Sequence, residues 1–245
     1  MLKNKVAIIT GATRGIGFAT AKLFLENHAK VVVLGSREES VKKALDNLSE
    51  YKENVLGFYP NLTSYEEIEE AFDNVYQKFG SIDILVNNAG VSSATKIDDY
   101  KEGDFEKIID LNVNAVYVCS KIAVKYMKKQ NNGVILNTSS MVSLYGQPSG
   151  SAYPTSKFAV NGLTKSLARE LGTYQIRVNA VAPGVVKTDM VAALPKEVID
   201  PIVKKIPLGR MAEPVDIANA FLYLASPMAS FVTGAILSVD GAGMD

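Results

Sequence analysis

Several residue types that often mark a function are scarce in this sequence. Its 245 residues include a single cysteine, Cys119, and a single histidine, His28. One cysteine excludes a disulfide within the chain and any metal site built from several cysteines, and we expect no metal site. The sequence also lacks a Gly-x-Ser-x-Gly segment, so a hydrolase of the Ser-His-Asp type is not expected. We expect Cys119 to be a buried apolar residue and His28 to lie on the surface at the end of a helix.

An excess of charge and long apolar runs are lacking too. The 26 Lys and Arg residues balance the 26 Asp and Glu residues, so the formal net charge is zero. We therefore expect neither a nucleic acid nor a membrane surface as partner. No apolar run approaches the ~20 residues of a membrane-spanning helix, and the segment Met1 to Lys5 shows no signal-peptide cleavage region. Without linkers or repeats, residues 1–245 are predicted to form one cytoplasmic domain.

Short apolar segments alternate with amphipathic segments along the whole chain. This alternation predicts an α/β fold of the Rossmann type, a doubly wound parallel sheet with its ligand site beyond the carboxyl ends of the strands. The predicted strands are Val6–Thr10, Lys30–Leu34, Asn54–Tyr59, Ile82–Val86, Gly133–Asn137, Ile176–Val181 and Ala235–Val239. The predicted helices are Gly15–Asn27, Glu38–Glu50, Ser64–Phe79, Asp104–Gln130 (one long helix or two abutting ones), Ser151–Leu171 and Pro214–Ala225.

Three glycines, Gly11, Gly15 and Gly17, follow the first predicted strand and open the first helix. Glycine allows a tight turn and close approach of the backbone to a phosphate, and a helix N-terminus attracts an anion. The spacing differs from the commonest dinucleotide fingerprint, so a plain strand-to-helix turn is the alternative. The place of this loop, after the first strand of an alternating chain, favours a dinucleotide site.

The residues after the second strand bear on the choice between NAD and NADP. Ser36 and Arg37 stand there, and no carboxylate occupies the strand end. A basic residue at this place accommodates the 2′-phosphate of NADP, and Arg14 in the glycine loop can add a second positive charge. We predict NADP(H) as the cofactor; the alternative is that both arginines are solvated surface charges.

A proton donor is predicted in the segment Tyr153 to Lys157. Tyrosine and lysine four residues apart share one face of a helix. A nearby ammonium favours the phenolate, and so we expect the tyrosine pKa to fall from its usual ~10. Ser140, after the fifth strand, can hydrogen-bond a substrate oxygen, and Asn112 could hold a water that relays protons to Lys157. Together with the glycine loop, these residues predict hydride transfer between a nicotinamide and an alcohol or ketone.

These motifs resemble those of the short-chain dehydrogenase/reductase family. The resemblance covers nearly the whole chain and includes Thr10–Gly17, Asn87–Gly90, Leu111–Val113, Pro183-Gly184 with Thr188, and Ser238–Gly241. It implies a homotetramer and a catalytic tetrad of Asn112, Ser140, Tyr153 and Lys157, with Tyr153 as acid and base. The expected cofactor contacts are Gly11, Thr13, Arg14, Gly15, Ile16, Gly17, Ser36, Arg37, Asn61, Leu62, Asn88, Ala89, Gly90, Tyr153, Lys157, Pro183, Gly184, Val186 and Thr188.

Within that family the chain is similar to beta-ketoacyl carrier-protein reductases, notably in Pro207–Arg210 and Pro214–Ala218. An acidic acyl carrier protein would need basic residues near the ends of the two central helices. The candidates there are Lys128, Lys129 and Arg177. Hydroxysteroid dehydrogenases and broad carbonyl reductases share the same core and are alternatives, as are an epimerase or dehydratase and a non-catalytic dinucleotide sensor. The segment expected to cover the substrate is apolar and contains Met190, Val191, Leu194, Val198, Ile199, Ile202 and Val203.

Overall fold

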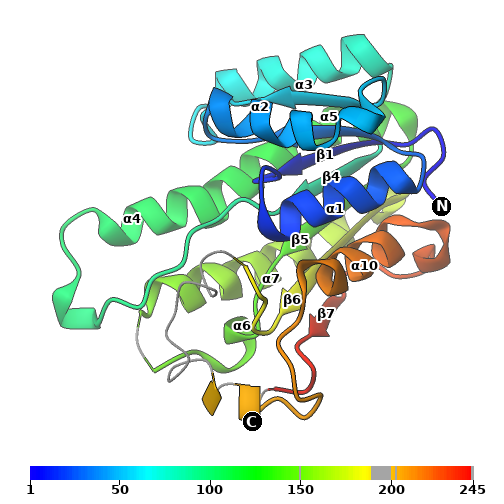
Figure 1. Cartoon of the computed structure of the whole chain (residues 1–245). Helices are drawn as coiled ribbons and strands as arrows, with labels where there is room; N and C mark the ends of the chain where they lie inside the picture. The colour runs from blue at the N-terminus through cyan, green and yellow to red at the C-terminus, as the bar shows by residue number, and fades with distance from the viewer. Residues whose placement is uncertain (149, 189–199, 202, 244–245) are drawn as a thin grey trace.

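A seven-stranded sheet forms the centre of the molecule, with strand order β3-β2-β1-β4-β5-β6-β7 and every neighbouring pair parallel (Figure 1). The computed structural model describes residues 1–148, 150–188, 200–201 and 203–243. The strands are β1 (Val6–Thr10), β2 (Lys30–Leu34), β3 (Val55–Phe58), β4 (Ile84–Asn87), β5 (Gly133–Thr138), β6 (Ile176–Pro183) and β7 (Ile236–Val239). The predicted doubly wound α/β fold is confirmed.

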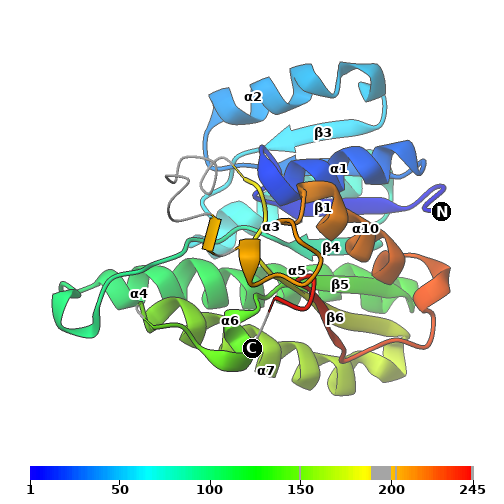
Figure 2. The same cartoon turned by 60° about the horizontal axis from the view of Figure 1, so that its bottom comes forward.

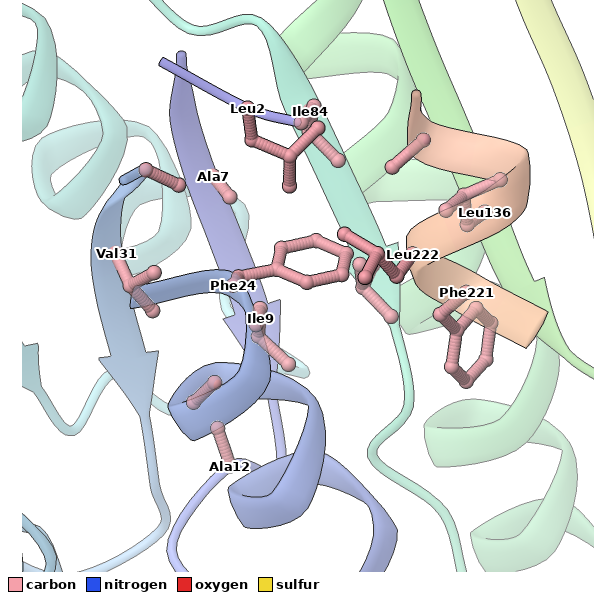
Figure 3. Close-up of a cluster of buried hydrophobic side chains, with 14 of the residues drawn as sticks. Leu2, Ala7, Ile9, Ala12, Phe24, Val31, Ile84, Leu136, Phe221 and Leu222 are labelled. Carbon is pink, nitrogen blue, oxygen red and sulfur yellow. The ribbon is translucent and has the colours of Figure 1, made fainter. Parts of the chain in front are cut away.

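Helices cover both faces of the sheet. They are α1 (Gly15–Glu26), α2 (Glu38–Asn47), α3 (Tyr65–Phe79), α4 (Asp104–Ile109), α5 (Ala115–Gln130), α6 (Val142–Tyr145), α7 (Ala152–Leu171) and α10 (Pro214–Ala225). Buried residues of α1, α2 and α10 form one apolar cluster with the sheet, and those of α3, α5 and α7 form the other. In the first cluster, Phe24 of α1 points toward Leu222 of α10 (Figure 3).

The strands read as continuous apolar runs because both of their faces are buried. Along β1, Ala7 and Ile9 belong to one cluster, whereas Val6 and Ile8 belong to the other. Successive side chains of a strand point to opposite faces, so a strand covered on both sides carries apolar residues at every position. The predicted bounds of β1 and β2 are confirmed.

Other predicted bounds differ from the structure at element ends. The first helix ends at Glu26, before the predicted Asn27, because His28 adopts a left-handed φ of 67°. The helix predicted to reach Glu50 ends at Asn47 and is followed by a short 3₁₀ turn. Ser64 is the N-cap of α3 and lies outside the helix, since its side chain accepts a hydrogen bond from the N–H of Glu67.

The predicted helix Asp104–Gln130 is continuous but not uniform: α4 and α5 are joined by a π-helical segment, Asp110–Asn114. The strand predicted over Ile82–Val86 runs from Ile84 to Asn87, and the carboxylate of the preceding Asp83 accepts a hydrogen bond from the N–H of Val6. Four other strands also differ by one or two residues at their ends: β3 is shorter than predicted, β5 and β6 are longer, and β7 begins one residue later. Helix α6 was not predicted.

The strand order reverses between β1 and β4, and this reversal creates the crevice in which open α/β sheets bind ligands. The carboxyl ends of β1, β4 and β5 carry Thr10, Asn87 and Thr138 to one edge of the sheet. Figure 2 shows α4 at the end of the molecule opposite the N-terminus, and α6 lies near this edge as well. The motifs that follow these strands therefore gather at one side of the sheet.

Candidate functional site

A pocket of about 620 Å³ lies at this carboxyl edge. Its walls come from the glycine loop after β1, the end of β2, and the segments after β3 and β4. The predicted cofactor residues that line it are Gly11, Thr13, Arg14, Gly15, Ile16, Ser36, Asn61, Leu62, Asn88, Ala89, Gly90 and Thr188. The structure therefore brings most of the predicted cofactor residues together around one cavity.

The glycine loop is held against the segment after β4 by hydrogen bonds. The amide of Asn88 donates to the carbonyl oxygens of Thr10 and Gly11, both at 3.1 Å. A Cβ at Gly17 would lie 2.4 Å from the carbonyl oxygen of Gly11 and 2.6 Å from the amide nitrogen of Asn88. Gly17 is therefore required for close packing of helix, strand and loop, while Gly11 and Gly15 adopt left-handed φ values of 62° and 56°.

The N-terminus of α1 is suited to an anion. Its N-cap residue, Arg14, makes no side-chain hydrogen bond to the helix, and the first turn carries no acidic residue. The first N–H groups of a helix lack partners within the helix and carry a partial positive charge. A pyrophosphate placed at this end of the pocket would meet those donors.

Some residues of the pocket were not predicted, and some predicted residues lie elsewhere. Leu34, Gly35, Tyr59, Pro60, Glu67, Val91 and Leu111 also line it. Most of these are neighbours of predicted residues; Glu67 is less obvious, since it reaches the wall from α3 by accepting a hydrogen bond from the N–H of Asn61 at 2.8 Å. The predicted residues outside the lining are Gly17, Arg37, Tyr153, Lys157, Pro183, Gly184 and Val186.

Tyr153 and Lys157 lie on successive turns of α7. The Nζ atom of Lys157 is 5.7 Å from the centroid of the Tyr153 ring. Lys157 is only 5% exposed, and its ammonium donates a hydrogen bond to the carbonyl oxygen of Thr138 at 2.8 Å. Ser140 is buried in the turn after β5, and its side chain hydrogen-bonds that of Tyr153. The structure thus brings Ser140, Tyr153 and Lys157 together, as predicted.

The direction of the tyrosine pKa corrects the prediction made from the lysine. Burial raises the pKa of Tyr153, and the hydrogen bond with Ser140 opposes this rise without reversing it. Burial also lowers the pKa of Lys157 to about 8. The sequence predicted a lowered pKa for Tyr153 because it shows the neighbouring cation but not the loss of water around the phenol. Tyr153 is therefore protonated at neutral pH in this structure, which suits the donor required for reduction of a ketone.

Asn112 lies in the π-helical segment between α4 and α5 and is fully buried. Its amide nitrogen donates to the carbonyl oxygen of Val91 at 2.8 Å and to the hydroxyl of Ser156 at 3.0 Å, and its Oδ1 accepts from the N–H of Val91 at 2.9 Å. Asn112 therefore joins the segment after β4 to α7 beside Lys157. A π-helical turn at such a place is common in functional sites. The water relay predicted for Asn112 stays a prediction.

The end of β6 supports the same region. The carbonyl oxygen of Pro183 accepts a hydrogen bond from the N–H of Met141 at 2.9 Å, next to Ser140. Gly184 packs on the C-terminal glycine motif, because a Cβ there would lie 2.7 Å from the Cα of Asp240. Most of the predicted apolar cover of the substrate, including Met190 to Ile199 and Ile202, lies outside the described residues.

The expected places of Cys119 and His28 are confirmed. Cys119 is buried, and burial raises the pKa of its thiol to about 12, so it is a packing residue. His28 is exposed just beyond the end of α1. In the part of the chain that the structure describes, no cluster of His, Cys, Asp and Glu could hold a metal ion. Within the same residues, no helix combines the length and apolar character that crossing a membrane requires.

Known proteins resemble this chain over nearly its full length. A family model described as enoyl-(acyl carrier protein) reductase matches residues 11–244. A 3alpha-hydroxysteroid dehydrogenase of Mediterraneibacter gnavus is 62% identical over 244 residues, covering 99% of this chain and 98% of that protein. A 3-oxoacyl-acyl-carrier-protein reductase of Thermotoga maritima is 41% identical over 244 residues, covering 98% of each. The crystal structure of gox2181 superposes with a TM-score of 0.94 at 33% identity, covering 99% of this chain and 96% of that one.

Proposed function

The chain belongs to the short-chain dehydrogenase/reductase family, and on that basis we propose that it is an NADP(H)-dependent dehydrogenase that interconverts a ketone and a secondary alcohol on a steroid. The names of two relatives, a hydroxysteroid dehydrogenase and a 3-oxoacyl reductase, support oxidoreduction at a CH–OH group. The observation that carries the steroid assignment is the 62% identity to a 3alpha-hydroxysteroid dehydrogenase over 99% of this chain.

A thioester ketone of the 3-oxoacyl carrier-protein type is the second candidate, favoured by relatives at 41% identity. Arg177, one of the three basic residues expected to bind an acidic carrier protein, already forms hydrogen bonds within the chain. The guanidinium of Arg177 is half-buried and donates to the carbonyl oxygens of Val232 at 3.3 Å and Ser226 at 3.4 Å. Lys128 and Lys129 remain exposed, with Lys128 Nζ lying 4.3 Å from the ring centroid of Tyr174. Lys128 and Lys129 thus remain available to an acidic partner, and the preference for the steroid rests on the higher identity to the hydroxysteroid dehydrogenase.

The residues present fit a dinucleotide. The uncapped N-terminus of α1, with no acidic residue in its first turn, would hold the pyrophosphate. Ser36, Asn61 and Leu62 would contact the adenosine half, and Arg14 with Arg37 would face a 2′-phosphate. The nicotinamide half would reach toward Tyr153, Lys157 and Thr188. By family resemblance we also propose a homotetramer, which sedimentation analysis can test.

When bound, the nicotinamide supplies or accepts a hydride at the substrate carbon. In reduction, the Tyr153 hydroxyl donates a proton to the carbonyl oxygen of the substrate, and in oxidation the phenolate takes a proton from the alcohol. Ser140 donates a hydrogen bond to the same oxygen and keeps it beside Tyr153. Lys157 stabilises the phenolate when the proton has left, because its ammonium lies close to the ring.

The experiment compares a panel of ketone substrates, and turnover is measured as the loss of NADPH absorbance. A 3-oxo bile acid, an acetoacetyl thioester on acyl carrier protein and the same acyl group on N-acetylcysteamine are compared by kcat/KM. We expect the steroid to be the best substrate. If kcat/KM were much higher for the carrier-bound thioester than for both small molecules, the protein would be a 3-oxoacyl carrier-protein reductase and not a steroid dehydrogenase. Failure to oxidise NADPH with any ketone would instead favour a dinucleotide sensor or an epimerase.

A further inference from the structure

A set of buried hydrogen bonds joins the turn after β5 to α7. The Oγ of Ser139 lies 2.7 Å from the Oδ1 of Asn161, and the amide nitrogen of Asn161 donates to the Oγ of Ser143 at 2.8 Å. The hydroxyl oxygens of Ser139 and Ser143 are in contact at 2.9 Å, but each hydroxyl proton is already donated, that of Ser139 to Asn161 and that of Ser143 to the carbonyl oxygen of Ser140. All three side chains are buried. We call Ser139, Ser143 and Asn161 the polar ring.

The polar ring holds the backbone of Ser140. The hydroxyl of Ser143 donates to the carbonyl oxygen of Ser140 at 2.6 Å, and the N–H of Ser143 donates to the same oxygen at 3.0 Å. On the other side of the turn, the N–H of Met141 donates to the carbonyl oxygen of Pro183 at 2.9 Å. The backbone that carries the Ser140 hydroxyl is therefore fixed to α7 and to β6 at the same time.

Asn161 continues the face of α7 that carries Tyr153 and Lys157. Positions separated by four residues stack on one side of a helix, and Tyr153, Lys157 and Asn161 follow that spacing. Lys157 bonds the carbonyl oxygen of Thr138, and Asn161 bonds the side chains of the turn that follows it. The end of β5 is thus attached to α7 at two successive helical turns. A rigid helix then sets how far Ser140 lies from Tyr153.

Packing alone would not require polar side chains at the positions of the polar ring. Burying a hydroxyl or an amide costs free energy unless hydrogen bonds compensate, and an apolar side chain could fill the same space. A buried polar network whose members are all satisfied instead specifies one arrangement of its neighbours. Among the described residues, the buried side-chain atom without a partner is Oδ1 of Asn87, which lies outside the polar ring. The side chains of the polar ring therefore all have partners, and the part that they fix is the turn of Ser140.

We propose that Asn161 and Ser143 are positioning residues that aim the Ser140 hydroxyl at the substrate oxygen beside Tyr153. The inference rests on the proposed function, in which Ser140 and Tyr153 act on that oxygen. Neither residue touches the substrate; both act through the backbone of Ser140. A displacement of about 1 Å at a reacting group can cost up to ~10²-fold in rate, so a shift of this turn is measurable in kcat.

The test compares Asn161→Ala and Ser143→Ala with a matched variant, Thr164→Val. Thr164 is equally buried on α7 and accepts a hydrogen bond from the side chain of Asn137 in β5 at 2.9 Å, but it bonds no member of the polar ring. With a 3-oxo bile acid and NADPH, we expect kcat to fall about tenfold in each ring variant. The KM for NADPH should stay within about twofold in both, because neither residue lines the cofactor pocket. Thr164→Val should lose stability and keep kcat.

A second arm places Asn161→Ala in a Ser140→Ala background. If Asn161 acts through Ser140, the double variant should be no slower than Ser140→Ala alone, because interacting sites are non-additive. Wild-type kcat in folded Asn161→Ala, or an equal loss in Thr164→Val, would overturn the inference. An inactive Ser140→Ala beside a fully active Asn161→Ala would leave the proposed function standing. Full activity of Ser140→Ala would overturn both. If Asn161→Ala does not fold, the inference is tested with Ser143→Ala, which removes only one oxygen atom.

Discussion

The ammonium of Lys157 donates a hydrogen bond to the backbone carbonyl oxygen of Thr138 across 2.8 Å, in a position where the lysine is 5% exposed. Among the ion pairs of the described residues, none includes Lys157. A buried lysine held by a carbonyl and not by a carboxylate costs folding free energy, and such groups are concentrated at functional sites. The same burial places the Lys157 ammonium next to the ring of Tyr153.

This cost should be visible as a pH dependence of stability. Burial lowers the pKa of Lys157 to about 8, from an ordinary value of 10.5. Between these values the unfolded chain binds more protons than the folded one, so the stability of the cofactor-free protein rises with pH across that window. Below it, the folded protein carries the full penalty, of order 3 kcal/mol.

Lys157→Met should remove this rise. Denaturant unfolding at neutral pH and at a pH near ~9.5 would measure it in wild type, in Lys157→Met and in Lys165→Met. Lys165 is an exposed lysine on the same helix, so its variant is the matched control and should keep the wild-type pH dependence. The same rise in Lys157→Met as in wild type would show that Lys157 is not the buried titrating group.

Tyr153→Phe should abolish turnover and leave NADPH binding nearly intact. Phenylalanine removes only the hydroxyl that donates the proton, and a positioned acid or base typically contributes ~10²–10⁴-fold to the rate. NADPH affinity is measured by fluorescence titration, and turnover by absorbance with a 3-oxo bile acid. Near-normal kcat in this variant would remove Tyr153 from the mechanism. Tyr145→Phe is the control, since Tyr145 is an exposed tyrosine on the neighbouring helix α6.

The sequence predicted the parts of the molecule that repeat a local pattern. Strands such as Val6–Thr10 are apolar at all but the last position, and the glycine spacing follows from the tight turn and close packing that the loop needs. The polar ring has no such pattern, because Ser139 and Asn161 are 22 residues apart and ordinary polar residues in isolation. The pKa of Tyr153 was predicted in the wrong direction because the burial of its phenol depends on the whole fold. Local spacing was therefore enough to predict the glycine loop and the candidate catalytic residues. The pKa of Tyr153 and the position of Ser140 depend on tertiary contacts.

Gly17→Ala should prevent cofactor binding. An added Cβ would meet the carbonyl oxygen of Gly11 at 2.4 Å, so helix α1 would have to move away from the glycine loop. Gly172→Ala is the control: a Cβ there meets nothing within 4 Å, and its φ of −57° suits alanine. Fluorescence titration with NADPH should give wild-type affinity for the control and no saturation for Gly17→Ala. Wild-type affinity in Gly17→Ala would exclude the proposed cradle for the pyrophosphate.

The preference for NADPH should depend on two arginines, Arg14 and Arg37. Arg14 lines the pocket and Arg37 is the exposed N-cap of α2, and among the described residues neither forms an ion pair. Charge-assisted hydrogen bonds to a phosphate contribute about 1.5–3 kcal/mol each, so NADPH should exceed NADH in kcat/KM by about tenfold or more.

Arg37→Asp should invert that preference, because it removes an attraction to the 2′-phosphate and adds a repulsion, while a carboxylate can accept hydrogen bonds from the ribose hydroxyls of NADH. Lys43→Asp makes the same charge change at an exposed position of α2 and should leave the preference as it is in wild type. The measurement is kcat/KM with each cofactor at one ionic strength, since exposed charges are screened by salt. If wild type used NADH as well as NADPH or better, Arg37 would be a solvated surface charge, and Glu38 would be the residue to test for contact with the ribose.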